Sequence, residues 1–273
     1  MTDSLAPEIL AYYTRGDEEG RLLRGTNRLE LWRTQDVLRR LLAPLAEDAA
    51  RRGTALRILD VGGGAGIHAQ WLAADGHRVE LVDPVPLHVE QAGRLAGVTA
   101  TLGDARALAA ADGSADVVLL LGPLYHLPER EDRLRALAEA RRVLRPGGLV
   151  VAATINRFAG VHDCVRSGSY FTPANQAVTD ACVATGALRP GGTANLFTTA
   201  YFHLAADVPV EFTEAGLTTT GQYGLEGAVW LLGVEERLDD PEQRALLLDV
   251  LRRAESEPSL LGVSGHLLTA GTA

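Results

Sequence analysis

The stretch Leu56–Gly66, LRILDVGGGAG, decides the fold, because it joins a buried strand to a glycine-rich turn. Its first half, Leu56–Val61, is mostly apolar, as expected of a strand in the middle of a sheet. The glycines that follow let the backbone turn tightly and approach a ligand without an intervening side chain. The sequence therefore predicts a first β-strand that ends at the binding site of a nucleotide-like cofactor.

The spacing of these glycines excludes the dinucleotide fingerprint G-x-G-x-x-G. Counted from Gly62, the third glycine would fall at Ile67, and counted from Gly63, the second would fall at Ala65. The turn instead follows an acid, Asp60, with the pattern G-x-G-x-G. The glycines of that pattern are Gly62, Gly64 and Gly66. An acid followed by this turn resembles motif I of class I S-adenosylmethionine (SAM) dependent methyltransferases, so SAM is the expected cofactor.

Composition indicates a globular protein without a nucleic-acid or membrane partner. The chain has 273 residues, 47% hydrophobic and 22% charged, and its net charge is -9. All 26 basic residues are arginines, which occur beside acids and form no stripe that would attract nucleic acid. The chain has no apolar run of membrane-spanning length and no secretion signal at its start, so we expect a cytoplasmic protein. The two cysteines, Cys164 and Cys182, lack C-x-x-C spacing and indicate neither a metal site nor a disulfide.

Strands and helices alternate along the chain after the glycine turn. Helices are expected at 67–74 and 130–144, and strands at 78–82, 99–102, 116–121, 149–155, 217–223 and 264–269. The resemblance to methyltransferases, strengthened by RVLRPGG before the fifth strand, implies an α/β Rossmann-like sheet of seven strands, mostly parallel, with an antiparallel last strand. We predict a helical N-terminal lid (1–50), a SAM-binding core (51–155), an inserted acceptor-binding lid (156–203), and completion of the sheet (204–273) with a helical excursion at 226–258.

Further residues are expected at the cofactor. Asp83 ends the second strand, where a carboxylate can accept two hydrogen bonds from a ribose diol, and Pro84 stiffens the adenine side. The sequence Gly103-Asp104-Ala105 resembles the adenine-binding motif of the family, with Asp104 and Ala105 as the contacts. Likeness of the N-terminal segments to a bacterial branch of small-molecule methyltransferases implies that Tyr13 and Arg33 reach the methionine carboxylate. Leu121, which ends the fourth strand, completes the predicted cofactor site.

The acceptor side is predicted from the segment after the fourth strand and from the insertion. His126 lies where the cofactor methyl group is expected, and imidazole can take a proton near neutral pH, so His126 is the candidate base or acceptor-orienting group. An ordinary backbone hydrogen bond of His126 is the alternative, with His162 or His203 as competing bases. The candidate acceptor contacts are Tyr125, Arg157, Phe158, Tyr170, Tyr201 and His203, although the insertion could equally be a packing subdomain.

These features predict an enzyme that transfers a methyl group from SAM to an oxygen or nitrogen of a small molecule, a specialised metabolite. Two alternatives stay open: a C-methyltransferase, and a catalytically inactive SAM-binding interaction protein. The sequence does not fix the oligomeric state, and a homodimer is compatible with it.

Overall fold

The computed structural model describes residues 6–14, 20–25, 27–191 and 196–273, and within them the chain forms a seven-stranded sheet with the order β3-β2-β1-β4-β5-β9-β8. Strands β1 to β5 are parallel, and β9 runs antiparallel to both β5 and β8. The predicted α/β fold with an antiparallel last strand is confirmed. The sheet strands are β1 (Arg57–Val61), β2 (Arg78–Asp83), β3 (Val98–Leu102), β4 (Ala115–Leu120), β5 (Leu144–Ile155), β8 (Thr218–Gly224) and β9 (His266–Thr272).

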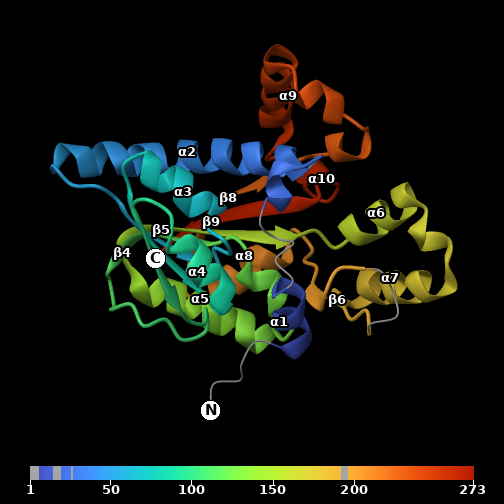
Figure 1. Cartoon of the computed structure of the whole chain (residues 1–273), viewed down its shortest axis with the longest axis horizontal. Coiled ribbons are helices and arrows are strands. Elements are labelled where there is room, and N and C mark those ends of the chain that lie inside the picture. The colour runs from blue at the N-terminus through green and yellow to red at the C-terminus, as the bar shows by residue number, and fades with distance from the viewer. Residues whose placement is uncertain (1–5, 15–19, 26, 192–195) are drawn as a thin grey trace.

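Helices cover both faces of this sheet (Figure 1). The α-helices are α1 (Pro7–Tyr13), α2 (Asn27–Arg51), α3 (Ile67–Ala74), α4 (Pro86–Ala92), α5 (Arg130–Val143), α6 (Ala159–Ser167), α7 (Pro173–Thr185), α8 (Asp207–Glu214), α9 (Pro241–Ala254) and α10 (Pro258–Leu261). Short 3-10 turns are η1 (Arg21–Leu23), η2 (Pro123–His126), η3 (Ser169–Phe171), η4 (Val229–Leu231) and η5 (Glu235–Leu238). Strands β6 (Ala187–Leu188) and β7 (Ala200–Tyr201) pair by themselves beyond β5.

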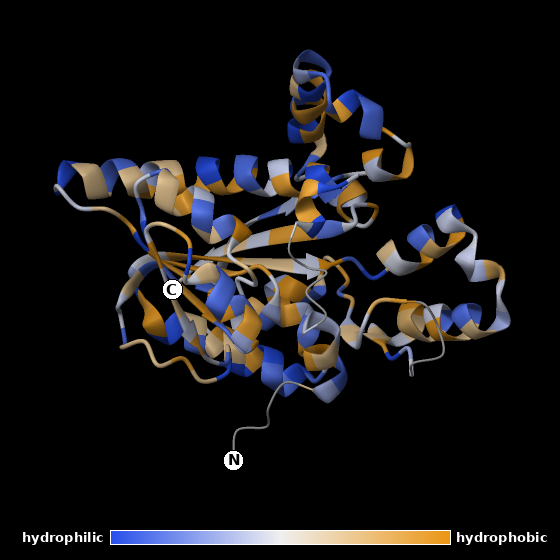
Figure 2. Cartoon of the chain, viewed as in Figure 1, coloured by the Kyte–Doolittle hydropathy of each residue, from blue (hydrophilic) through white to orange (hydrophobic). Residues whose placement is uncertain are grey.

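The core consists of two layers, because successive side chains of a strand point to opposite faces of the sheet. Ile58 and Val117 pack with α2, α3 and α4 on one face. Their neighbours Leu59 and Val118 pack with α5 and α8 on the other face. In Figure 2 much of the inner part of the sheet is apolar, while the helices alternate between apolar and polar residues. The continuous apolar run of β4 is thus explained by burial on both faces.

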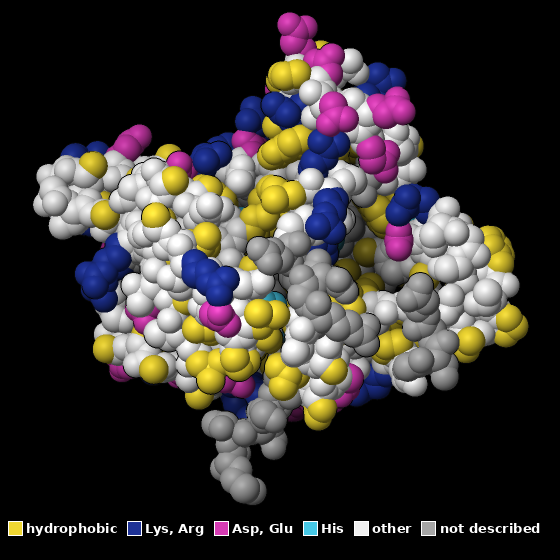
Figure 3. All heavy atoms as spheres, in the orientation of Figure 1, with side chains coloured by type: hydrophobic (Ala, Val, Ile, Leu, Met, Phe, Trp, Pro, Cys, Tyr) yellow, Lys and Arg dark blue, Asp and Glu magenta, His cyan; other side chains and the backbone are white. Residues whose placement is uncertain are grey.

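The polar surface agrees with the charge pattern of the sequence. On the face shown in Figure 3, arginines and acidic side chains are interspersed and form no stripe of one sign. Among the described residues, no helix combines the length and apolar character that a bilayer crossing requires.

The order of the strands creates the place where a ligand can bind. Beside β1 the sheet continues to β2 on one side and to β4 on the other, so the chain reverses its direction of winding there. In open α/β sheets, ligands bind at such a switch point, beyond the carboxyl ends of the strands. The loops after β1, β2, β3 and β4 therefore meet at one edge.

Candidate active site

The glycine turn after β1 forms the floor of the site. Gly62 must be a glycine because a Cβ atom there would lie 2.7 Å from a ring carbon of Pro123. Gly64 has a φ of 58°, which favours glycine, and the side on which a Cβ would project is open space. Gly66 opens α3 and packs against Leu95, so it shapes the turn without lining the cavity.

A cavity of about 160 Å³ lies over this turn, and most of the predicted cofactor residues line it. These are Tyr13, Asp60, Gly62, Gly64, Asp83, Pro84, Asp104, Ala105 and Leu121, together with Tyr125 and His126 from η2. They come from the loops after four strands and from α1, so distant parts of the sequence converge here. The structure shows that these residues line one cavity, and their roles toward a ligand stay predictions.

Asp60 is the most unusual of these residues. It is fully buried, and neither of its carboxylate oxygens has a hydrogen-bond partner among the described residues. Burial, together with the charge of Asp83, raises the pKa of Asp60 to about 7. A buried carboxyl group without a donor is costly unless a ligand supplies one. Since Asp60 lines the cavity, it fits a ligand that carries a cationic hydrogen-bond donor.

Asp83 ties the glycine turn to the end of β2. Its Oδ2 accepts a hydrogen bond from the backbone N–H of Gly64 at 2.9 Å, and its Oδ1 accepts one from Val85 N–H at 2.9 Å. His88 Nδ1 lies 3.0 Å from the same Oδ1. The carboxylate of Asp83, which lines the cavity, is therefore fixed before any ligand arrives.

Asp104 is held by its neighbour Arg106. The Arg106 backbone N–H and Nε both donate to Oδ1, and Nη2 donates to Oδ2 at 2.7 Å. Burial alone would raise the pKa of Asp104, but the bonds from Arg106 hold it below its usual value. Arg106 also lines the cavity, so this segment presents a guanidinium that the sequence interpretation did not consider.

Arg33, predicted to reach the methionine carboxylate of the cofactor, lies away from the cavity. Arg33 is fully buried on α2 and is absent from the cavity wall. Its Nη2 donates to Glu255 at 2.5 Å, its Nη1 to Asp36 at 2.6 Å, and its Nε to the carbonyl of Leu225. Through these bonds Arg33 holds α2 against the end of α9. Arg21 from η1 and Glu30 from α2 line the cavity instead, although no motif in the sequence pointed to either.

Tyr13 and His126 contact each other at the cavity wall. The Tyr13 hydroxyl lies 2.5 Å from His126 Nε2, and the Tyr13 ring also makes edge contacts with His88 and His126. Burial lowers the pKa of His126 to about 4, against the opposing influence of the Thr199 backbone and of Asp83. His126 is therefore neutral near pH 7 but a weaker base than an ordinary histidine, and Tyr13 occupies its Nε2 in this arrangement.

A second cavity of about 630 Å³ adjoins the first. Tyr13, Arg21, Glu30 and Tyr125 line both cavities and so form their junction. The second cavity lies beside α6 and α7, and its wall combines apolar side chains with polar and charged ones. Its larger apolar side chains are Ile155, Leu188, Leu196, Phe197, Phe202 and Trp230. A space of this size is in the range of small-molecule sites.

Two of the predicted acceptor residues, Tyr125 and Arg157, line this second cavity. The Arg157 Nε donates to the carbonyl of Phe202 at 2.7 Å, and its Nη2 lies 3.3 Å from the Tyr201 hydroxyl. Arg157 is thus held in place by its own chain while one part of it faces the cavity.

The other four predicted acceptor residues do not line either cavity, which corrects the sequence prediction. Phe158 is partly exposed on the surface, and the Tyr170 hydroxyl donates to Asp180 at the surface. Tyr201 packs against Arg133, whose guanidinium carbon is 3.8 Å from the ring centroid. His203 is fully buried, 3.5 Å from Glu211. These four residues thus lie away from the cavities, whereas Phe197 and Phe202 of the same insertion line the second cavity.

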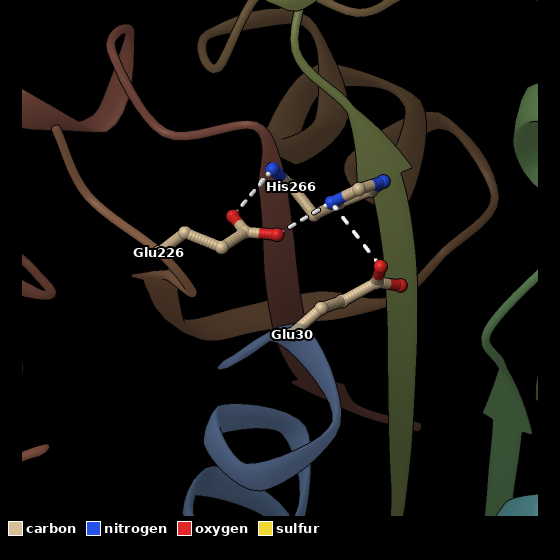
Figure 4. A group of neighbouring side chains, drawn as sticks. All are labelled: Glu30, Glu226 and His266. Atoms are coloured by element: carbon tan, nitrogen blue, oxygen red, sulfur yellow. Dashed lines mark hydrogen bonds and ion pairs between the residues drawn. The ribbon is translucent and has the colours of Figure 1, made fainter. Parts of the chain in front are cut away.

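A polar cluster that the sequence interpretation missed stands at the edge of the second cavity (Figure 4). His266 Nδ1 lies 2.6 Å from Glu226 Oε1 and 3.9 Å from Glu30 Oε2. Although burial lowers the pKa of His266, the two carboxylates raise it to about 9 overall. The cluster unites α2, the loop after β8 and the start of β9, so no local sequence signal could have revealed it.

The comparisons with known proteins agree with this geometry. Residues 59–152 match the model of a family described as a methyltransferase domain. A ubiquinone biosynthesis O-methyltransferase of Methylocella silvestris is 39% identical over 107 residues, which cover 37% of this chain and 41% of that protein. A ubiquinone/menaquinone biosynthesis C-methyltransferase of Acidiphilium cryptum is 39% identical over 99 residues, 33% of this chain and 39% of that protein. The similarity thus spans about two fifths of the length of these relatives.

Solved structures show the same fold over more of the chain. A magnesium protoporphyrin IX methyltransferase from Synechocystis PCC 6803 with bound SAH has a TM-score of 0.58, 15% identity, and coverage of 97% of both chains. A SAM-dependent methyltransferase from Methanosarcina mazei has a TM-score of 0.53 and 17% identity, and the match covers 80% of this chain and 92% of that one. Residues 59–152 thus resemble a methyltransferase domain, and the chain has the same fold as these solved SAM-dependent methyltransferases.

Proposed function

We propose that this protein transfers a methyl group from SAM to an oxygen or nitrogen of a small molecule, a specialised metabolite, in the cytoplasm. The observation that carries the proposal is the pair of cavities that meet at Tyr13, Arg21, Glu30 and Tyr125. The first cavity lies over the glycine turn, where the family binds its cofactor. The second has room for an acceptor that reaches the same junction.

The first cavity offers the groups that SAM requires. The unpartnered Asp60 carboxyl suits the ammonium group of the methionine part, and the open side of Gly64 leaves room for close approach. Asp83 would accept from the ribose hydroxyls, and Asp104 with the Ala105 backbone would contact the adenine. Loss of a buried hydrogen-bond partner costs about 1 to 3 kcal/mol, so Asp83→Ala should weaken SAM binding by roughly ten- to a hundredfold.

When bound, SAM supplies an electrophilic methyl group, and the residues of this chain have to hold the acceptor in line with it. Proximity and alignment account for most of such an acceleration, so a shaped, water-excluding second cavity matters more than any one side chain. A base is needed only where the acceptor atom arrives protonated. His126 is proposed for that task, and it becomes available when the Tyr13 hydroxyl leaves its Nε2.

The second cavity favours an acceptor that has both apolar and polar parts. Phe197, Phe202 and Trp230 supply apolar wall, Arg157 and Arg166 stand among the polar lining, and Glu30 and Arg21 lie at the junction. A carboxylate at the junction would accept a hydrogen bond from a hydroxyl or an amine, which supports transfer to oxygen or nitrogen. Transfer to carbon is the second candidate, because one relative is named a C-methyltransferase.

Turnover of labelled SAM tests the proposal. The purified protein is incubated with methyl-labelled SAM and a small-molecule extract of the producing cell, and the labelled product is identified. Asp83→Ala should lose the product, whereas Tyr170→Ala, a surface variant, should retain it. A label on carbon would support the second candidate. SAM binding without any labelled product would show a SAM-binding interaction protein and would overturn the enzymatic proposal.

The oligomeric state and the exclusion of nucleic acid as a substrate need tests of their own. We propose a homodimer, which light scattering would confirm or refute. We also propose that nucleic acid is not a substrate, and a retarded band in a mobility-shift assay with tRNA would contradict this.

A further inference from the structure

Three side chains that are far apart in the sequence meet beside the second cavity. Glu30 lies near the start of α2, Glu226 follows β8, and His266 is the first residue of β9. Pairing of β9 with both β5 and β8 carries Glu226 and His266 to the ligand-binding edge of the sheet. One ligating atom of each residue lies within 4.8 Å of the other two (Figure 4).

The donor atoms are one imidazole nitrogen and two carboxylate oxygens. Divalent transition metals such as Zn²⁺, Mn²⁺ and Fe²⁺ accept this mixture, whereas Mg²⁺ and Ca²⁺ prefer oxygen alone. With metal–ligand bonds of about 2.1 Å, neighbouring ligand atoms stand roughly 3.0 to 3.4 Å apart. The distances from His266 Nδ1 to Glu226 and to Glu30, 2.6 and 3.9 Å, bracket that separation. Small side-chain rotations would bring all three to a common ion.

Glu226 is positioned in advance for such a role. Its side chain is buried, and its Oε2 accepts hydrogen bonds from the Ser264 hydroxyl at 3.0 Å and from the His266 backbone N–H at 2.9 Å. These bonds fix one oxygen and leave Oε1 directed at the His266 ring. Metal sites in proteins are commonly oriented by outer hydrogen bonds of this kind.

The cluster is also reachable. Glu30, Glu226 and His266 all line the second cavity, and Glu30 lines the first cavity as well. Small ligands or water from the cavity could therefore complete the coordination of an ion. Arg21, whose Nη1 lies 3.2 Å from Glu30 Oε2, now balances part of the negative charge and would have to yield to the ion.

We infer that Glu30, Glu226 and His266 form a binding site for a divalent transition-metal ion at the wall of the acceptor cavity. A bound ion would act as a Lewis acid near the junction of the two cavities, where it would polarise an acceptor hydroxyl. This catalytic consequence rests on the proposed function, but the binding of the ion does not.

Cobalt(II) titration of the full-length protein, freed of any purification tag, tests the site. Co²⁺ reports its ligands through visible absorption bands, and Zn²⁺ should displace it. We expect a single saturable equivalent in the wild type and its loss in Glu226→Gln and His266→Gln. His77→Gln and Glu235→Gln change a histidine and a glutamate that line neither cavity, so they serve as matched controls that keep the site. Near-UV circular dichroism verifies that each variant is folded.

Two further variants keep the inference falsifiable if the buried positions do not tolerate change. Glu30→Gln removes a ligand from the partly exposed end of the cluster, and Ser264→Ala should weaken Co²⁺ affinity by about 10- to 100-fold through loss of the outer hydrogen bond. Equal Co²⁺ binding by Glu30→Gln and the wild type, or no saturable binding by the wild type, would overturn the site. Methyl transfer measured with labelled SAM is a separate readout, so failure of the metal site and failure of the proposed function remain distinguishable.

Discussion

The free energy of unfolding of Asp60→Asn should rise relative to that of the wild type as the pH increases. In the folded chain, burial and then the charge of Asp83 raise the pKa of Asp60 from 3.8 to about 7. Between these two values the folded state retains a proton that the unfolded state has released. Stability of the wild type therefore falls with rising pH through this window, by about 1.4 kcal/mol per pH unit.

The size of the effect follows from the difference between a pKa of 3.8 in the unfolded chain and about 7 in the folded one. Above pH 7 the ionised, buried carboxylate costs the wild type about 4 kcal/mol in free energy of unfolding, whereas the neutral asparagine has no such term. Most of the change falls between about pH 5 and about pH 8, where the difference between the two proteins should grow by about 3 kcal/mol. This range is accessible without acid denaturation of the rest of the chain.

Urea unfolding of both proteins at several pH values measures the difference. Saturating SAM should reduce the pH dependence of the wild type, because an ammonium group beside Asp60 favours the ionised carboxylate. Asp60→Asn should bind SAM more weakly in calorimetry. Unfolding free energies that stay parallel for the two proteins from about pH 5 to about pH 8 would refute the argument, since Asp60 would then titrate alike in both states.

Three other substitutions distinguish effects on stability, on SAM binding and on use of the acceptor. Arg33→Met should lower the free energy of unfolding by about 1.5 to 3 kcal/mol, because Asp36 and Glu255 lose a buried charged partner and keep only the more exposed Arg40 and Arg252, and unchanged SAM affinity of the folded fraction in calorimetry would exclude Arg33 from the site. Tyr13→Ala should speed both association and dissociation of SAM in stopped-flow measurements, since the ring bridges the cavity to His126, and unchanged rates would contradict a gating role. Tyr125→Ala should lower product formation with the labelled extract while Tyr170→Ala does not, because only the former lines the junction, and equal losses would show that the insertion acts as a whole.

The sequence predicted the fold and the floor of the site because both depend on local patterns. Apolar runs of strand length, separated by helical repeats, define a parallel sheet whose central strands are buried on both faces. The glycine turn after Asp60 and the acid that ends β2 are likewise features of single short segments. Once these strands pair in parallel, their carboxyl ends have to lie at the same edge. Asp60, Gly64 and Asp83 therefore reach one cavity without any further information.

The tertiary structure alone decided which side chains complete that cavity. Glu30 and Arg33 are less than one turn apart on α2, yet Glu30 lines both cavities and Arg33 is buried against Glu255. That choice depends on where the end of α9 packs, more than 200 residues further along the chain. His266 and Glu226 meet only because β9 pairs antiparallel with β8. A helix or strand pattern fixes which side of an element is apolar, but the neighbour that covers each polar residue is determined by how distant segments pack.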